Sequence, residues 1–516
     1  MNKNEIIKVN LLLIGVLIYL FYNTGFYSDD FIEFITEYNL NIHSLSEFFH
    51  IDMKTHHVAI FSVFSSYFHR FWLLLFGDNN FLYFIPKVLI SYLAIVLTYK
   101  FFRQFLSQHN AMFIAVLFVL FPLHDATNYW YSALKYTMVP AIILYGFYLI
   151  NQNRFKLGFF TLTFGSFYGF SSPPYIIGLS FYFLLVKEFK KFFVSLIPTL
   201  FYILFYFYIT LFSDGPQGRI DSGLNILKLI KQYILQIGTF FDTAVGPSMW
   251  LKLFYSISNI TLTSLSIGVL LIFTFYKYYE VHEEKRNNKL LLTLMLVLAL
   301  GLGIFSLTSL YPQIAFNLGN RVTIYSSLLL SFIIVFYLLK NKNIATIIFS
   351  IFILSVLGIS DHWKAWNKTQ LVIINNITNN QSLQEFDRTK QLFVSYGQYS
   401  KLGSLSHIEF FAQGMTSHIF KLATNKEYKV STINRRFIKK DDFLVDKKFD
   451  IKTKIDDFVY IYDSKENKLI TIKKENIQEY INNLPKDNRH WIQLLSKDNF
   501  IMKIVLKLMP RLEYAL

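Results

Sequence analysis

The feature that most limits how this chain folds is a series of long apolar segments that ends near residue 360. A helix that crosses a bilayer needs about 20 mostly apolar residues, because the hydrocarbon core is roughly 30 Å thick and a helix rises about 1.5 Å per residue. The sequence therefore predicts an α-helical polytopic membrane protein with about eleven transmembrane helices in residues 1–360. The candidate spans, several of them short for a full crossing, lie near residues 6–26, 80–103, 110–123, 134–151, 157–170, 174–187, 192–212, 250–276, 289–310, 321–340 and 344–360.

Basic residues in the short loops predict which side of the membrane each loop occupies. They gather in alternate loops, for example at residues 100–103, 187–191 and 277–289, and such loops normally face the cytoplasm. The first apolar segment has no small-residue cleavage pattern, so it is expected to remain as a span. These features predict a cytoplasmic N-terminus and a long acidic outer loop over residues 27–79 that carries interfacial helices.

Residues 361–516 differ from the preceding part because they are rich in Lys, Asp, Asn and Gln. With an odd number of spans and a cytoplasmic N-terminus, this part lies outside the cytoplasm. Apolar and polar residues nearly alternate over 458–462 and 468–474 around a polar turn, which predicts a β-hairpin. Helices are expected over 369–376 and 473–483, so residues 361–516 are predicted to form a soluble extracytoplasmic α+β domain.

The charge and the missing residue types exclude several functions. The net charge of +16 is divided between the predicted cytoplasmic loops and the C-terminal part, which favours an anionic membrane surface over nucleic acid, since no nucleic-acid-binding motif is present. The absence of Cys excludes disulfides, Cys-ligated zinc, iron–sulfur centres and thiol nucleophiles. The sequence also lacks a Walker A loop, a GxSxG elbow and an HExxH motif, which disfavours ATP-driven transport and serine or zinc hydrolysis.

The most specific polar motif is Tyr27-Ser28-Asp29-Asp30-Phe31, directly after the first span. Two adjacent carboxylates at a lipid boundary repel each other and are costly to desolvate, so their presence there calls for a compensating role. One interpretation is a general base beside a carboxylate that binds an acceptor or a metal ion. The other is a solvated acidic loop that only sets the orientation of the chain. We take Asp29 and Asp30 as the candidate catalytic residues.

Other polar residues of the predicted outer loops are candidates for substrate binding. Asp125 and Lys135 stand among aromatic residues in the 121–136 segment, which suits a sugar ring but is also typical of an ordinary headgroup belt. Arg321 begins a late span, where a guanidinium beside a helix N-terminus suits a phosphate, although it can also simply reach the headgroups. The adjacent His56 and His57 lack the spacing of a metal motif, so hydrogen bonding is favoured and no metal ligand is assigned. The substrate-binding candidates are Lys54, His57, Arg70, Asp125, Lys135 and Arg321.

Three segments together resemble the polytopic glycosyltransferases of the GT-C superfamily. These are YSDDF at residues 27–31, the FGDNN segment at residues 76–80 and FPLHDATNYWYSALKY at residues 121–136. The likeness covers roughly residues 1–360 and is nearest to bacterial enzymes that decorate lipopolysaccharide or other envelope glycans, and more distantly to protein O-mannosyltransferases. The paired acids of that superfamily match Asp29 and Asp30, whereas the match at Arg321 is weaker because the phosphate-binding residues vary between its branches.

The resemblance implies transfer of a sugar from a polyprenyl-phosphate carrier to an acceptor hydroxyl of an envelope glycan, lipid or protein. Such a protein lies in the bacterial inner membrane and acts on its outer face, usually with inversion. A departing phosphate is weakly basic and needs no general acid, so one base suffices. By this likeness Asp29 is the base, Asp30 orients it or the acceptor, and Arg321 with other cations neutralises the phosphate. No cofactor is assigned with certainty, and a divalent cation is left open.

Three other classes remain as alternatives. A polymerase of O-antigen or capsule also has many spans, but it is expected to rely on Arg-rich outer loops rather than paired acids. A transporter or flippase of lipid-linked glycans needs a polar pathway, and charges within the predicted spans are scarce. A non-catalytic protein of polysaccharide assembly is the third alternative.

Overall fold

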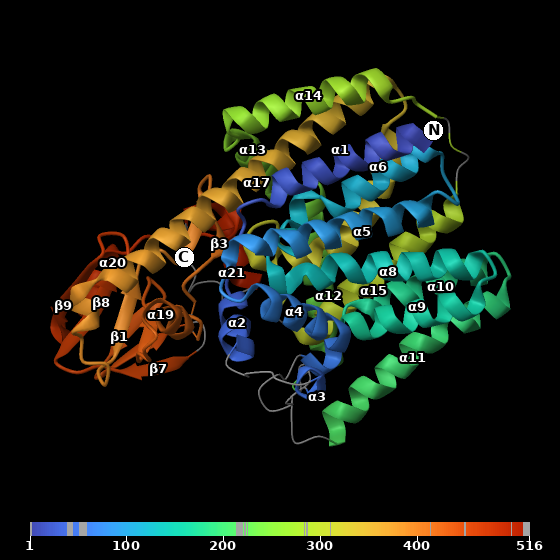
Figure 1. Cartoon of the computed structure of the whole chain (residues 1–516). Coiled ribbons are helices and arrows are strands. Elements are labelled where there is room, and N and C mark those ends of the chain that lie inside the picture. The colour runs from blue at the N-terminus through green and yellow to red at the C-terminus, as the bar shows by residue number, and fades with distance from the viewer. Residues whose placement is uncertain are drawn as a thin grey trace. The chain divides into compact units, whose positions relative to one another are not determined.

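The computed structural model divides into two compact units, shown in Figure 1. The helical unit comprises Met1–Gly25, Leu40–Ala315 and Gly319–His362, and the mixed unit comprises Phe26–Asn39, Phe316–Leu318 and Trp363–Leu516. The residues that the structure describes are 3–38, 45–50, 59–212, 220, 223, 225–282, 284, 287–309, 311–412, 414–447, 450–496 and 498–508.

The helical unit is built from apolar helices that pack side by side. Helix α8 packs on both α5 and α9, and α10 packs on both α11 and α15. In chain order the helices are α1 (Lys3–Phe21), α3 (Leu45–Phe49), η1 (Ala59–Ser62), α4 (Val63–Phe76), η2 (Asn80–Tyr83), α5 (Phe84–Phe102), α6 (Gln108–Val119), η3 (Pro122–His124), α7 (Ala126–Tyr129), η4 (Tyr131–Ala133), α8 (Leu134–Asn151), α9 (Phe155–Tyr168), α10 (Ser172–Leu185), α11 (Phe189–Phe212), α12 (Ile226–Ala244), α13 (Pro247–Ser258), α14 (Leu262–Tyr278), α15 (Asn288–Thr308), η5 (Leu318–Thr323), α16 (Ile324–Ile333), η6 (Ile334–Leu338) and α17 (Lys342–Asn379).

The protein is an integral membrane protein, but the predicted number of eleven spans is not confirmed. Among the described residues, six helices are long and apolar enough to cross a membrane, or up to seven if a bent pair counts as one span. Shorter apolar helices cover Ile7–Phe21, Gln108–His124 and Ser172–Leu185, where full spans were predicted. Apolar composition alone does not register where a helix stops, so it does not fix the number of spans. Helix α17 is one of these six helices, and it continues past residue 360 to Asn379.

The span predicted over residues 250–276 is not one continuous helix, because the chain breaks there into α13 and α14. The bend between Ile226–Ser258 and Leu262–Tyr278 is 111°. The Thr261 side chain caps α14 by accepting a hydrogen bond from the Ser264 backbone N–H. The Asp361 carboxylate in turn accepts hydrogen bonds from the Thr261 backbone N–H at 2.8 Å and from the Ser264 hydroxyl at 2.7 Å. Capping thus ends one helix and starts another inside an apolar segment.

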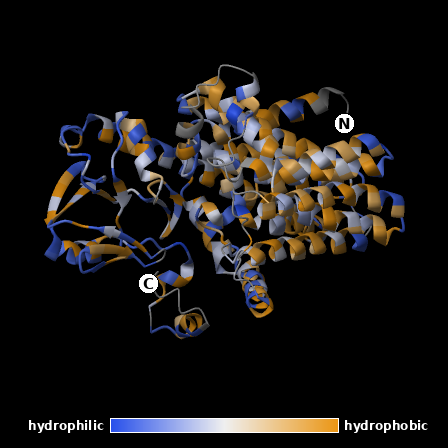
Figure 2. Cartoon of the chain, turned by 90° about the horizontal axis from the view of Figure 1, so that it is seen from below, coloured by the Kyte–Doolittle hydropathy of each residue, from blue (hydrophilic) through white to orange (hydrophobic). Residues whose placement is uncertain are grey.

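Several helices present apolar side chains outward, as expected for contact with lipid. On α11, Leu204, Leu211 and Phe212 are 66%, 71% and 76% exposed. Such exposure of large apolar side chains is unfavourable in water but not in hydrocarbon. Figure 2 shows hydrophobic residues along the lengths of these helices and hydrophilic ones at the turns that join them.

Close approach of two helices depends on one glycine of α17. A Cβ atom placed on Gly358 would lie 1.8 Å from the backbone oxygen of Ser256 in α13, far inside van der Waals contact. Small residues at such crossings allow backbones to pack closely in a membrane. By contrast, a Cβ on Gly15 in α1 meets nothing within 4 Å.

The mixed unit contains the predicted β-hairpin, which is confirmed. Strands β8 (Phe458–Asp463) and β9 (Lys468–Lys473) pair antiparallel, and the predicted second helix corresponds to η7 (Lys474–Asn476) and α20 (Ile477–Asn483). The predicted helix at residues 369–376 is part of α17. The remaining elements are α2 (Asp30–Tyr38), α18 (Gln381–Gln384), β1 (Leu392–Ser395), β2 (Tyr399–Leu402), β3 (Leu405–Glu409), α19 (Thr416–Thr424), β4 (Val430–Thr432), β5 (Phe437–Lys440), β6 (Phe443–Asp446), β7 (Ile451–Lys454), η8 (Trp491–Leu494) and α21 (Phe500–Leu508).

The main sheet of the mixed unit has the strand order β4-β1-β8-β9. Strand β1 is parallel to both β4 and β8, and Phe393 of β1 lies opposite Ile461 of β8. An apolar cluster that includes Phe393, Ile461 and Ile477 joins the sheet to α20. The sheet therefore has its own hydrophobic core, as a compact domain requires.

We predict that Gly358→Ala lowers the melting temperature of the detergent-solubilised protein, because the added methyl group must push α17 away from α13. Overpacking of this kind costs about 1–3 kcal/mol. The matched Gly15→Ala variant should melt no lower than the native chain, since it has open space and alanine favours helix. Equal melting temperatures for the two variants would contradict the close contact.

Candidate apolar cavity and its charged rim

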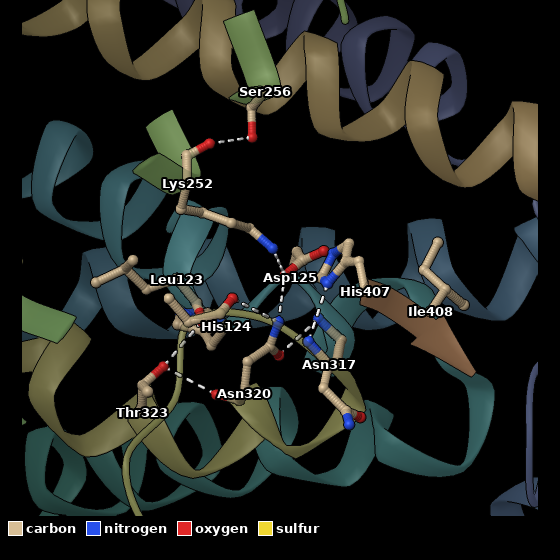
Figure 3. A network of polar contacts seen from close by, with 12 residues as sticks. Leu123, His124, Asp125, Lys252, Ser256, Asn317, Asn320, Thr323, His407 and Ile408 are labelled. Carbon is tan, nitrogen blue, oxygen red and sulfur yellow. Dashed lines mark hydrogen bonds and ion pairs between the residues drawn. The ribbon is translucent and has the colours of Figure 1, made fainter. Parts of the chain in front are cut away.

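The helical unit contains a buried ion pair. The Lys252 ammonium of α13 is 3.0 Å from the Asp125 carboxylate, which lies between η3 and α7. The two side chains are 0% and 3% exposed. Figure 3 shows the Lys252 side chain pointing at Asp125. Charges removed from water to this extent are tolerated only when they are paired and hydrogen-bonded.

Asn320 connects this ion pair to η5. Its side-chain amide donates to Asp125, and its side-chain oxygen accepts from the backbone N–H of Ala126 at 3.2 Å (Figure 3). The Thr323 hydroxyl donates to the backbone oxygen of Leu123 at 3.1 Å. Asp125, predicted as a substrate-binding residue, thus takes part in a network that fastens η5 to the segment after α6.

Arg321, the next residue along η5, lies against three aromatic rings. Its guanidinium carbon is 5.0 Å from the ring centre of Trp130, 5.5 Å from that of Tyr311 and 5.8 Å from that of Tyr136. These distances allow cation–π attraction, which orients a guanidinium without removing its hydrogen-bond donors. Arg321 also lies near the start of the Leu318–Leu338 span, where the sequence predicted that a late span begins.

A large apolar cavity adjoins Arg321 among the membrane helices. Its volume is about 800 Å³, and α10, α11, α12 and α15 supply most of its wall. Arg321 is the one charged side chain among its lining residues in the part of the chain that the structure describes. The wall includes Phe170, Tyr202, Tyr233, Ile304, Phe305 and Tyr325. An amphiphilic molecule with an apolar body and an anionic end matches such a lining.

Two other predicted cations, Lys135 and Arg70, are not among the lining residues of the cavity. Lys135 of α8 is half-buried, with its ammonium 5.7 Å from the ring centre of Phe170. Arg70 of α4 is 3% exposed and donates to the backbone oxygens of Phe48 and His50. Its guanidinium therefore helps to hold the 45–50 segment. Lys54 and His57 lie outside the described residues.

The paired acids belong to the mixed unit and differ in their surroundings. Asp30 is 1% exposed, and its carboxylate accepts from the backbone N–H of Tyr27 at 3.0 Å. Asp29 is only half-buried. Ser28, between Tyr27 and Asp29, has a φ of 51°, a left-handed conformation that is uncommon for a residue with a side chain. Strained backbone of this kind gathers at functional sites.

Sequence reasoning missed two buried lysines. Lys252 was placed inside a continuous span, and Lys87 of α5 was passed over although it is fully buried. The Lys87 ammonium donates to the backbone oxygens of Thr24 at 3.1 Å and Gly25 at 2.8 Å, just after α1 ends. A lysine inside an apolar segment is the signal that would have found both.

Comparison with known proteins adds little to this picture. No known protein-family model matches the chain, and no curated protein matches it in sequence. One solved structure that the chain is similar to is ArnT from Cupriavidus metallidurans bound to undecaprenyl phosphate, at 10% sequence identity. The alignment covers 84% of this chain and 90% of that chain, with a TM-score of 0.35. A score of this size does not establish a common fold.

We predict that Lys252→Met lowers the free energy of unfolding by about 3–5 kcal/mol, because it leaves the Asp125 carboxylate buried without its cation. Adding Asp125→Asn should recover part of the loss, since both charges are then gone. Thermal unfolding in detergent measures both effects.

The matched control is Lys421→Met, which breaks an exposed ion pair with Glu427 at 2.9 Å. It should change the melting temperature little, because exposed pairs are screened by water. If the two Lys→Met variants melted alike, the Lys252–Asp125 pair would not have the structural role assigned to it.

Proposed function

We propose that the protein is a membrane glycosyltransferase of the GT-C type that takes its sugar from a polyprenyl-phosphate carrier. The observation that carries this proposal is the apolar cavity among the membrane helices with a single cation, Arg321, in its described lining. A polyprenyl phosphate is an apolar chain with an anionic end, and it reaches such a cavity from the bilayer. A soluble nucleotide-sugar donor would instead need a polar site.

The rim of the cavity suits the phosphate part of such a donor. A guanidinium offers several donors in a planar fork, which matches the oxygens of a phosphate. The three rings around Arg321 restrain it, so less conformational entropy is lost when it binds. The indole N–H of Trp130, whose ring contacts Arg321, is buried and has no hydrogen-bond acceptor among the described residues.

The proposed chemistry requires one base. The acceptor hydroxyl gives its proton to the Asp29 carboxylate while its oxygen forms a bond to the anomeric carbon. The bond from that carbon to the phosphate oxygen breaks, and its electron pair leaves with the phosphate, whose charge Arg321 offsets. Because the leaving group is a weakly basic phosphate, no general acid is involved. Attack opposite the leaving group inverts the anomeric carbon.

The acceptor and the orientation of the chain belong to the same proposal. We infer an acceptor hydroxyl on an envelope glycan, lipid or protein at the outer face of a bacterial inner membrane. The N-terminus is then cytoplasmic, and residues 361–516 are extracytoplasmic. The distribution of basic residues among the loops supports this orientation.

A transporter of lipid-linked glycans is the second candidate, because the same cavity would hold its cargo. Such a protein binds the lipid without breaking a bond, so it needs Arg321 but no base. Sugar transfer and lipid binding must therefore be measured separately, and a variant of Asp29 separates the two candidates.

We predict that Arg321→Gln weakens binding of a polyprenyl phosphate about 10- to 100-fold, because hydrogen bonds to a charged group are worth about 1.5–3 kcal/mol. Binding of the matching polyprenol, which has no phosphate, should hardly change. Competition against a radiolabelled polyprenyl phosphate in detergent measures both affinities.

Gly303→Leu tests the other end of the ligand, because it fills the cavity without removing a charge. A Cβ on Gly303 meets only the Tyr233 ring, at 3.9 Å, so a larger side chain projects into the space. We expect this variant to weaken the binding of polyprenyl phosphate and of polyprenol by similar factors. Gly238→Leu, at an exposed glycine, should change neither affinity. Equal weakening of both ligands by Arg321→Gln would contradict phosphate binding by Arg321.

We predict that Asp29→Asn lowers the rate of sugar transfer at least 100-fold while polyprenyl phosphate still binds, since a general base contributes roughly 10²- to 10⁴-fold. The assay follows sugar transfer from a polyprenyl-phosphate sugar in membranes that contain equal amounts of each variant.

Glu33→Gln is the matched control, because it neutralises a carboxylate in the first turn of α2, the helix that begins directly after Asp29. It should keep most of the native rate. A native rate in Asp29→Asn would exclude Asp29 as the base, and transfer activity absent from the native chain too would favour the transporter.

A further inference from the structure

Three potential metal ligands meet at the first turn of α6, away from the cavity. The Nδ1 atom of His109 lies 3.3 Å from the Nε2 atom of His282, and the Glu280 carboxylate lies 4.0 Å from that same Nε2. One ligand atom from each of these residues lies within 4.8 Å of the other two. His109 is half-buried, whereas His282 and Glu280 are exposed, so an ion can enter from solvent.

The separation of the two imidazole nitrogens is the separation that a tetrahedral ion imposes. Zinc–nitrogen bonds are about 2.0–2.1 Å long, so two nitrogens at a tetrahedral angle lie about 3.3–3.4 Å apart. The observed 3.3 Å therefore fits two ligands of one ion.

Neighbouring contacts hold the two ligand-bearing segments together. The Tyr279 hydroxyl donates to the Asn110 side-chain oxygen at 3.0 Å. The Glu284 carboxylate accepts from the backbone N–H of Ser107 at 2.7 Å and from the Asn110 amide at 2.9 Å. Because these bonds flank His109 and His282 on both sides, the ligands are positioned before any ion arrives.

We propose that His109, His282 and Glu280 bind a zinc-class divalent metal ion, with water completing a tetrahedral site. Two imidazoles and one carboxylate are a common ligand set for zinc and leave one position for water. The ion ties the segment after α14 to the first turn of α6. Since α6 has 12 residues, the site lies about 18 Å along the helix from the Asp125 network, so it supports structure rather than sugar transfer.

The test is metal titration of the full chain, purified in detergent without a polyhistidine tag and freed of metal by a chelator. Zn²⁺ should bind with one ion per chain by calorimetry and raise the melting temperature. Co²⁺ should give the intense visible absorption of a tetrahedral site. Loss of a residue that only supports a metal ligand weakens metal binding roughly 10- to 100-fold. His109→Ala and His282→Ala each remove a ligand itself, so each should weaken Zn²⁺ binding by at least that factor.

Two further variants keep the test independent of folding. His282→Cys should still bind Co²⁺ and add a thiolate-to-metal absorption band, because sulfur replaces nitrogen as a ligand. His418→Ala, in α19, should bind Zn²⁺ like the native chain. The proposal is overturned if the native chain binds no ion, or if the double variant His109→Ala/His282→Ala binds Zn²⁺ as tightly as the native chain.

Discussion

The arrangement of the helical unit depends on keeping one carboxylate satisfied in its apolar interior. Asp125 is fixed by the Lys252 ammonium and by the Asn320 amide, and these three side chains come from three separate segments. Pairing one cation with one anion removes most of the desolvation penalty, and the amide occupies a further lone pair of the carboxylate. The ion pair therefore selects a single position for α13 and η5 against the segment after α6. Since Arg321 directly follows Asn320, and Trp130 follows Asp125 by five residues, the same network sets where the cation and its aromatic neighbour lie.

Two buried lysines and the half-buried Arg321 of this unit differ in their surroundings. Lys252 contacts a carboxylate, and Lys87 contacts the backbone oxygens that follow α1, so each satisfies a group of the protein itself. Arg321 instead lines a cavity of about 800 Å³ whose other described lining residues carry no charge. Lysine suits the first task as a compact charge that several oxygens can surround. Arginine suits the second, because aromatic rings hold the face of its guanidinium while its edge keeps several donors. Its position in the cavity wall is the reason for assigning ligand binding to Arg321.

Apolar periodicity predicted the elements whose sequence pattern is local. It did not predict the elements whose ends depend on contacts with residues far away in the sequence. The β8–β9 hairpin was predictable because alternation and its turn lie within one short stretch. The break between α13 and α14 was not, because it depends on Asp361, about a hundred residues further on, capping the start of α14. Likewise, Asp125 was recognised as a notable polar residue, but its partner Lys252 is 127 residues away. Arg321 was found from its position at the start of a span, whereas the cavity beside it is assembled from helices that no single-sequence pattern brings together.

The two adjacent acids illustrate how one motif can divide its tasks. Had both carboxylates faced the same space, their mutual repulsion would raise the cost of ionising the second. In the mixed unit, Asp30 is buried and closes the turn by accepting from the Tyr27 backbone N–H, while Asp29 is half-buried. The left-handed backbone of Ser28 makes this division possible, because it turns the chain sharply between Tyr27 and the pair. In the proposed mechanism, Asp30 is therefore a positioning residue that fixes the turn, and Asp29 is the base. A motif that looks symmetrical in sequence is therefore asymmetrical in structure, because one carboxylate is buried in the turn and the other is half-buried.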